Sequence, residues 1–398
     1  MTPRTSSTLQ RLSESATLAM ARMARELRAE GHDVIALSLG EPDFDTPDFV
    51  KDAAKRAIDD NHTHYTPVGG YGDVLEAISY KLKRDNNLDY SPQQIVVSTG
   101  AKQTIANAVM ALVSPGEEVV LPAPFWVSYS EIVKLAGGIP VIIPTGIETD
   151  FKVTPDQLEH HIGPKTRMMI FSSPCNPTGS VYNREELAEM AKIIVAHPEL
   201  IVICDEIYEL IRFEGQHESL ASFPEVYDQV ITVNGVSKGF AMTGWRLGYM
   251  GAPEWIAKAC MKMQGQTTSA PCSISQKAAQ AAVAADPASV SYMRDAFFRR
   301  RALMLELLGE ISGLKLNVPE GAFYIFPECS SYFGKSWEGG VINDASDLCM
   351  YLLKQAHVAV VTGDAFGAPD YFRISYAASE DSLREAARRM KIALDQLS

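Results

Sequence analysis

Short apolar runs alternate with longer amphipathic stretches through the first 285 residues of the chain. The apolar runs are hydrophobic on both faces and rich in β-branched residues; they lie at 94–98, 118–122, 139–144, 167–173, 200–206, 229–234 and 246–251. The stretches between most of them, such as 184–197, repeat their apolar residues with helical spacing. Two-faced strands that alternate with helices predict a mostly parallel sheet covered by helices on both sides.

The pattern changes after residue 285. A long amphipathic helix is predicted over 294–311, and short strands are predicted around 323–326, 359–363 and 372–377, before a terminal helix. The fold class is therefore α/β, with a large domain over 46–285 and a smaller α+β domain over 286–398. The N-terminal segment 1–45 is expected to join the smaller domain.

Charge and cysteine content narrow the possible functions. The 398 residues carry 36 Lys and Arg against 49 Asp and Glu, a net charge of −13 that argues against a nucleic-acid partner. The six cysteines form no CxxC pair, so neither a disulfide framework nor a structural zinc site is expected. No apolar run approaches the roughly 18 residues of a membrane span, and a signal peptide is not evident. We expect a soluble cytoplasmic protein.

Polar residues at the carboxyl ends of the predicted strands are the first candidates for chemistry, because ligands bind at that edge of α/β sheets. Asp205 ends one strand, with Tyr208 just beyond it, and Lys238 follows the next strand. An Asp at this position can simply cap a helix, and a lysine here can be a solvated loop residue. Alternatively, the Asp can hold a cationic ring nitrogen, as pyridoxal phosphate requires, and a lysine in apolar surroundings can supply the neutral amine of Schiff-base chemistry.

Three further positions could bind anions. Gly100, Ala101 and Lys102 turn from a strand into a helix N-terminus, which attracts anions. Arg246 could bind a phosphate or form a surface ion pair, and Arg373, inside a strand, could clamp a carboxylate or form an internal salt bridge.

A proline-rich turn adds a polar candidate of another kind. Asn176 lies in the turn 173–179, where a cis proline is plausible. The turn could be merely rigid, or it could present Asn176 to a ring oxygen.

Together these residues resemble the class I family of fold-type I, pyridoxal-phosphate-dependent aminotransferases, and within it the bacterial aspartate aminotransferase branch. The resemblance covers nearly the whole chain. It is carried by Leu39-Gly40-Glu41-Pro42-Asp43-Phe44, Tyr65-Thr66-Pro67, Asn176-Pro177-Thr178-Gly179, Asp205-Glu206-Ile207-Tyr208, Ser237-Lys238 and Arg373.

The resemblance implies a role for each catalytic candidate. Lys238 would bond the cofactor covalently and later carry the proton of the substrate α-carbon. Asp205 would keep the pyridine nitrogen protonated. Tyr208 and Asn176 would hydrogen-bond the phenolic oxygen of the ring, and Trp126 would stack on the ring beside the substrate.

It also implies the binding sites and the assembly. The phosphate would be bound by Gly100, Ala101, Lys102, Ser237 and Arg246, with Tyr65 reaching in from a second copy of the chain, so that the active unit is a homodimer. The substrate α-carboxylate would be bound by Arg373, in a pocket lined by Gly40, Trp126 and Asn176, with Ser15 and Thr17 near the entrance. No metal is implied.

The expected reaction is ping-pong transamination between an L-amino acid, with aspartate first, and 2-oxoglutarate or oxaloacetate. Segment 263–276 contains no arginine that could bind a second substrate carboxylate. Aromatic amino acids or prephenate are therefore alternative substrates, and a pyridoxal-phosphate-dependent carbon–sulfur β-lyase is an alternative activity. A cofactor-sensing transcription regulator would need a DNA-binding domain, and no GxGxxG follows a strand as a nicotinamide enzyme requires.

Overall fold

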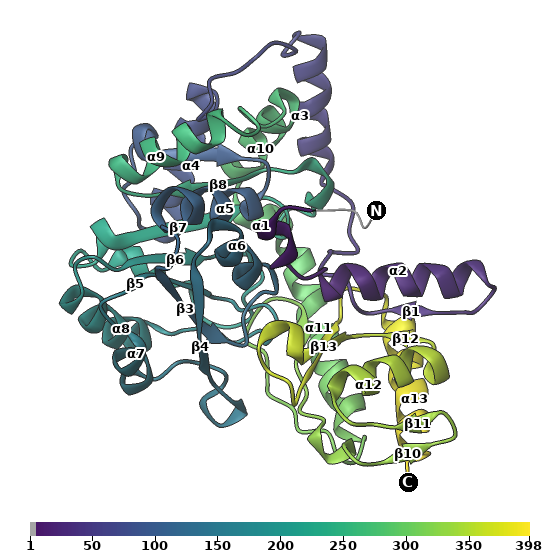
Figure 1. Cartoon of the computed structure of the whole chain (residues 1–398). Helices are drawn as coiled ribbons and strands as arrows, with labels where there is room; N and C mark the ends of the chain where they lie inside the picture. The colour runs from purple at the N-terminus through teal and green to yellow at the C-terminus, as the bar shows by residue number, and fades with distance from the viewer. Residues whose placement is uncertain (1–4) are drawn as a thin grey trace.

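The computed structural model describes residues 5–398 and contains a seven-stranded central sheet (Figure 1). Its strands, in spatial order, are β2 (Ile95–Ser98), β8 (Gly248–Gly251), β7 (Val230–Gly235), β6 (Ile201–Asp205), β5 (Thr166–Ser172), β3 (Glu118–Ala123) and β4 (Ile139–Pro144). Within this sheet only β8 runs antiparallel to its neighbours, so the predicted mostly parallel sheet is confirmed.

Helices cover both faces of this sheet, because its strands bury apolar side chains in both directions. Along β3, Val119 and Leu121 belong to one apolar cluster and Val120 to the other. The first cluster packs under α5 (Ala101–Leu112), α6 (Ser128–Ala136) and α9 (Glu254–Gly265). The second packs under α4 (Gly72–Asn86), α7 (Pro155–His161), α8 (Arg184–Ala196) and α10 (Ser273–Ala284), and α3 (Asp48–Asp59) lies against α10.

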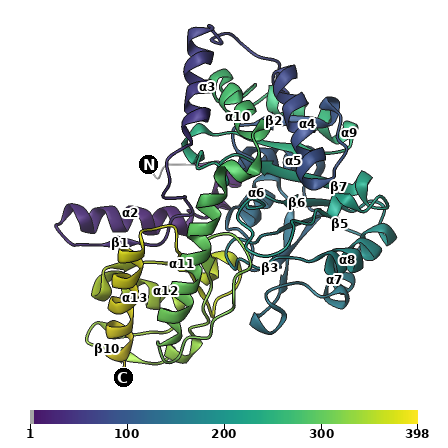
Figure 2. The same ribbon diagram turned by 180° about the vertical axis from the view of Figure 1, so that it is seen from behind.

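The C-terminal part is built around a smaller antiparallel sheet of β13 (Val361–Thr362), β14 (Phe372–Ser375) and β9 (Tyr324–Ile325). A hairpin of β10 (Ser336–Trp337) and β11 (Gly340–Val341), and the helices α12 (Ala345–Tyr351) and α13 (Glu380–Asp395), complete this part. Figure 2 shows α11 (Ser291–Gly309) running from the sheet-bearing part into it.

The N-terminal segment lies against the C-terminal part. Strand β1 (Ile35–Ala36) pairs in parallel with β12 (Val358–Ala359), and α2 (Ala16–Ala29) lies beside β12 and β13. A short helix, α1 (Ser7–Gln10), precedes α2 and contacts α6. The strand predicted over 359–363 is split into β12 and β13, because its two halves pair with different partners. The domain boundaries at 45 and 285 stay a prediction.

The carboxyl ends of three central strands lie side by side. Ser172 at the end of β5 pairs with Asp205 at the end of β6, and Asp205 pairs with Val233 of β7, shortly before Lys238. The loops that follow these strands therefore meet at one edge of the sheet. No helix between residues 5 and 398 is long and apolar enough to cross a membrane.

Candidate active site

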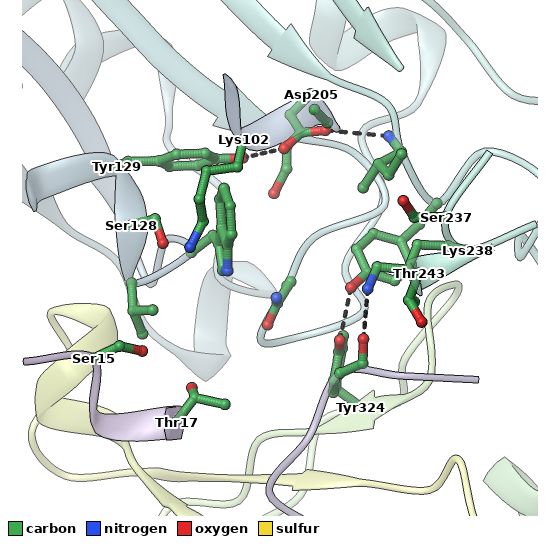
Figure 3. A pocket seen from close by; sticks show the side chains of 18 of the residues that line it. Ser15, Thr17, Lys102, Ser128, Tyr129, Asp205, Ser237, Lys238, Thr243 and Tyr324 are labelled. Atoms are coloured by element: carbon green, nitrogen blue, oxygen red, sulfur yellow. Dashed lines mark hydrogen bonds between the residues drawn. The ribbon is translucent and has the colours of Figure 1, made fainter. Parts of the chain in front are cut away.

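A cavity of about 280 Å³ lies at this edge of the sheet, between the strand ends and the C-terminal part (Figure 3). Its walls consist of Ser15, Thr17, Leu18, Gly40, Ala101, Lys102, Trp126, Val127, Ser128, Tyr129, Ser172, Asn176, Asp205, Ile207, Tyr208, Ser237, Lys238, Thr243, Arg246, Tyr324 and Arg373. The structure thus brings together all the candidate site residues except Gly100 and Tyr65.

Asp205 is a buried carboxylate that points into the cavity from the end of β6. It accepts hydrogen bonds from the hydroxyl of Tyr129 at 2.7 Å and from the backbone N–H of Ile207 at 3.2 Å (Figure 3). Burial raises its pKa from 3.8 to about 6. No cationic side chain among residues 5–398 forms a salt bridge with it, so the carboxylate can receive a cationic group of a ligand.

Lys238 lines the same cavity as Asp205 and is half-buried. Its Nζ atom donates to the carbonyl oxygen of Gly40 at 2.5 Å. Burial, and to a smaller extent the nearby positive charge of Arg373, lower the pKa of the amine from 10.5 to about 8. About a tenth of such an amine is neutral at pH 7, which makes it a far better nucleophile and base than an ordinary lysine.

Arg373, on β14, is only 2% exposed and has no carboxylate partner among the described residues. Its Nη1 atom donates to Oδ1 of Asn176 at 2.8 Å and its Nη2 atom to the carbonyl oxygen of Ser38 at 2.6 Å, while Nε has no acceptor. The internal salt bridge considered for this residue is therefore wrong. A buried guanidinium with only neutral partners is costly, and a carboxylate from a ligand would remove that cost.

Asn176 is held between the sheet and the C-terminal part by the turn 173–179, in which the Ser173–Pro174 bond is cis. Gly179 ends the turn with φ +71°. A glycine is needed there, because a Cβ atom would lie 2.6 Å from the carbonyl oxygen of Gly321. The oxygen of the Asn176 amide accepts from Arg373, so its NH₂ group is left to donate to a ligand.

The N-terminus of α5 forms an anion site. Gly100, at φ +82°, precedes the helix and offers no side chain, and the N–H groups of Ala101 and Lys102 have no acceptor in the described part of the chain. A Cβ atom at Gly100 would lie 2.5 Å from Nη2 of Arg246, so only glycine lets the guanidinium approach this helix end. Arg246 forms no ion pair within residues 5–398. Helix dipole and guanidinium together suit a phosphate group.

The side chain of Lys102 lies over Trp126 rather than over the helix end. Its Nζ atom is 5.0 Å from the centre of the Trp126 ring, on the side of the cavity where Ser15, Thr17 and Ser128 lie (Figure 3). Burial lowers the pKa of this amine, and Arg246 lowers it further. From the sequence alone, Lys102 is expected only to bind phosphate, and this position over Trp126 is not predicted.

Two tyrosines also escaped the sequence analysis. Tyr129 of α6 donates to Asp205, and the hydroxyl of Tyr324 of β9 lies 2.6 Å from that of Tyr208. For Tyr129 a signal existed, because a buried Asp205 needs a donor and the residue follows Trp126 by three positions. For Tyr324 no local signal exists, since it reaches the cavity only through the packing of the C-terminal part.

Tyr65 does not reach this cavity within one chain. It is fully exposed and borders a separate hollow formed with segment 268–273. Its expected role in the site of a second copy therefore stays a prediction.

Comparison with known proteins shows similarity along nearly the whole chain. Residues 32–390 match the family model described as aminotransferase class I and II. The chain is 50% identical over 389 residues to a protein from Pinus pinaster named aspartate aminotransferase, covering 96% of this chain and 79% of that protein. It is 46% identical to the aspartate/prephenate aminotransferase of Cereibacter sphaeroides, covering 97% of each. The crystal structure of the aspartate aminotransferase from Rhizobium meliloti superposes with a TM-score of 0.96 at 42% identity, over 100% of both chains.

Proposed function

This chain belongs to the aminotransferase class I and II family and is a transaminase, and from that premise we propose that it moves the amino group of L-aspartate to a 2-oxo acid with pyridoxal 5'-phosphate as cofactor. The observation that carries the proposal is the buried guanidinium of Arg373, which has no protein carboxylate as partner and lies in the same cavity as Lys238 and Asp205. Such a cavity is suited to an α-carboxylate next to a reactive amine.

The residues of the cavity fit the cofactor in chemical type. An unpaired buried carboxylate, Asp205, suits a ring nitrogen that carries a proton, and the α5 N-terminus with Arg246 suits a phosphate. Trp126 offers an aromatic face, and Asn176 and Tyr208 offer donors for a ring oxygen. Lys238 offers an amine of lowered pKa. When bound, pyridoxal phosphate supplies an aldehyde carbon for an amine and a ring that withdraws electrons from the substrate α-carbon.

Each of the main residues of the cavity then has a separate role. Lys238 holds the cofactor and, in its neutral form, takes the proton from the substrate α-carbon, which its lowered pKa permits near neutral pH. Asp205 would keep the ring nitrogen protonated, because a buried anion favours a nearby cation. Arg373 orients the substrate by its α-carboxylate, with Asn176 fixing the guanidinium.

Lys102 is our candidate for the second carboxylate of aspartate. Its amine lies over Trp126, beside the hydroxyls of Ser15, Thr17 and Ser128, and no acidic side chain of residues 5–398 forms a salt bridge with it. This would supply the cation that segment 263–276 lacks. The phosphate contact expected of Lys102 then reduces to its backbone N–H.

Prephenate is the second candidate substrate. The Cereibacter sphaeroides relative is named for both aspartate and prephenate, and prephenate also carries two carboxylates, so Arg373 and Lys102 could hold either molecule. Because both substrates use the same two cations, only their relative rates distinguish them.

We further propose that the active unit is a homodimer in which Tyr65 of each copy completes the phosphate site of the other. Its full exposure supports this, because a bare tyrosine on the surface of one chain is suited to a contact with a second chain. The six unpaired cysteines support a reducing compartment such as the cytoplasm.

The test follows the visible absorbance of the purified protein loaded with pyridoxal phosphate. Aspartate is expected to abolish the band of the bound cofactor, and 2-oxoglutarate is expected to restore it. Phenylalanine added in place of aspartate, and prephenate added in place of 2-oxoglutarate, rank the alternative substrates. Release of pyruvate and ammonia without any 2-oxo acid would instead identify a β-lyase, and a protein that takes up no cofactor would refute the proposal.

A further inference from the structure

Tyr324 is a buried residue of the cavity to which the proposed function assigns no role. Its hydroxyl lies 2.6 Å from the hydroxyl of Tyr208, and the two rings meet edge to face with centres 5.8 Å apart. Tyr208 belongs to the turn after β6, whereas Tyr324 belongs to β9 of the small sheet. This hydrogen bond therefore joins the edge of the central sheet to the C-terminal part.

The surroundings of Tyr324 fix the position of its hydroxyl. The guanidinium carbon of Arg373 lies 4.6 Å from the centre of the Tyr324 ring. On the other side, a Cβ atom at Gly40 would clash with the hydroxyl oxygen, so the hydroxyl occupies space that only a glycine leaves open. Among residues 5–398, Tyr208 is the one hydrogen-bond partner of this hydroxyl. The Tyr324 hydroxyl therefore has one orientation available and one group to act on.

Each of the two hydroxyls has one proton, and this decides which of them donates when the cofactor is bound. A tyrosine hydroxyl has one proton to donate and can also accept. In the proposed function, Tyr208 donates its proton to the ring oxygen of the cofactor. Its oxygen can then only accept from Tyr324, so Tyr324 must donate.

We propose that Tyr324 is a positioning residue whose O–H donates to Tyr208 and thereby aims the O–H of Tyr208 at the ring oxygen of the cofactor. This inference rests on the proposed function. Hydrogen bonds in a chain polarise one another, so the donation from Tyr324 makes Tyr208 a stronger donor. Because Tyr208 is the partner of the Tyr324 hydroxyl, Tyr324 acts through Tyr208.

The experiment is a pH titration of the visible absorbance of the loaded protein, a readout that does not depend on turnover. A donor at the ring oxygen stabilises its anionic form and so lowers the pH of the spectral transition. Tyr324→Phe is expected to raise the midpoint by roughly half a pH unit, the size of one weakened neutral hydrogen bond. Tyr208→Phe is expected to raise it by more, because the direct donor is lost.

The double variant Tyr208→Phe/Tyr324→Phe distinguishes a relay from an independent effect. If Tyr324 acts only through Tyr208, adding Tyr324→Phe to Tyr208→Phe moves the midpoint no further. The matched control is Tyr376→Phe, which removes another fully buried hydroxyl nearby, one that donates to the carbonyl oxygen of Ala322 at 3.3 Å. It is expected to leave the midpoint at the wild-type value.

An unchanged midpoint in Tyr324→Phe, or a shift that persists in the Tyr208→Phe background, overturns the inference while the proposed function stands. A wild-type protein that binds no cofactor overturns both. Should Tyr324→Phe fail to fold, Tyr324→Met removes the same hydroxyl, and the same comparison is made with that variant.

Discussion

Burial changes the pKa values of Lys238 and Asp205 in opposite directions, because in each case it disfavours the charged form. The two groups therefore approach each other in pKa, at about 8 and about 6. The same desolvation therefore makes Lys238 a base with a pKa near neutrality. It also makes Asp205 an acid that a nearby cation can readily ionise. Desolvation of these charged groups costs the folded protein free energy, and this free energy can be measured in the absence of cofactor.

The pKa of Lys238 predicts how the stability of the cofactor-free protein depends on pH. The unfolded chain keeps this proton up to about 10.5, whereas the folded chain releases it near 8. Between these values the unfolded state binds more protons, so stability rises with pH, by at most about 3 kcal/mol for this half-buried group. Lys238→Met lacks this rise, so urea midpoints of the two proteins are expected to diverge as the pH increases from about 8 to about 10.5.

The control for this experiment is Lys258→Met, which removes an exposed lysine whose side chain is 67% accessible. Its urea midpoint is expected to follow that of the wild type throughout. Parallel curves for Lys238→Met and the wild type would show that the amine is not desolvated.

Arg373 and Lys102 are expected to differ in the substrates that they affect. The α-carboxylate is common to all substrates, so Arg373→Ala should raise KM for every amino acid and oxo acid, by roughly tenfold to a hundredfold for a lost charged hydrogen bond. Lys102→Met should raise KM for aspartate and 2-oxoglutarate and spare phenylalanine. Steady-state kinetics with these three substrates check both; an equal effect of Lys102→Met on all three contradicts the proposed role.

Two local features of the elements around the cavity can be tested separately. The first is the N-terminal segment, which passes the cavity just before Ser15. The backbone N–H of Ser13 donates to a carboxylate oxygen of Glu131 on α6 at 2.7 Å, and Lys134 holds the other oxygen at 2.8 Å. This contact ties the segment between α1 and α2 to the wall of the cavity.

Ser13→Pro deletes the donating N–H, whereas Ser13→Ala keeps it. We expect Ser13→Pro to be cleaved by trypsin after the exposed Arg11 several times faster than the wild type, and to show a higher KM for aspartate. Ser13→Ala is expected to match the wild type in both measurements. Equal cleavage of the two variants would mean that the Glu131 contact does not hold the segment.

The second feature is a buried charge cluster behind Asp205. Lys81 of α4 forms an ion pair with Glu209 and donates to Asn86 at 2.7 Å, while His217 lies 2.9 Å from a carboxylate oxygen of Glu206. These contacts attach the turn that contains Asp205 and Tyr208 to helix α4. Lys81 is thus the cationic partner of the buried Glu209.

Lys81→Met leaves the buried Glu209 without its cation, which is expected to cost about 3 to 5 kcal/mol of unfolding free energy. The matched control is Lys83→Met on the same helix, whose exposed pair with Asp89 spans 3.3 Å and should contribute less than about 1 kcal/mol. Urea unfolding at a fixed protein concentration compares the two. A midpoint of Lys81→Met close to that of Lys83→Met would mean that the cluster adds nothing to stability.

At the scale of the whole molecule, the local pattern of the sequence predicts the main sheet and the polar residues at its strand ends, whereas Gly40, Trp126 and Ser237 are expected only from the resemblance to a family. Strands that are apolar on both faces can only lie in a covered sheet, and Asp205 and Lys238 follow adjacent strands. The direction of β8 could not be predicted, because burial on both faces is the same for either direction. Tyr324 and the orientation of Lys102 could not be predicted either, since they depend on how distant parts of the chain pack.

Contacts between two copies of the chain cannot be predicted from local pattern either. They can be tested by substituting Tyr65. Suppose one chain carries Tyr65→Ala and a second carries Lys238→Ala. If Tyr65 acts across the interface, a mixed dimer has one site with both defects and one intact site, because the intact Lys238 receives the intact Tyr65 from its partner. Random mixing of equal amounts should then restore about a quarter of the wild-type sites.

Each variant alone provides the baseline, measured at a pyridoxal phosphate concentration that is limiting for Tyr65→Ala. Activity in the mixture above the mean of the two separate variants supports a shared site. If Tyr65 instead served its own chain, every site in the mixture would carry one of the two defects, and mixing would restore nothing. Since one chain leaves Tyr65 fully exposed and outside its own cavity, we expect the rescue.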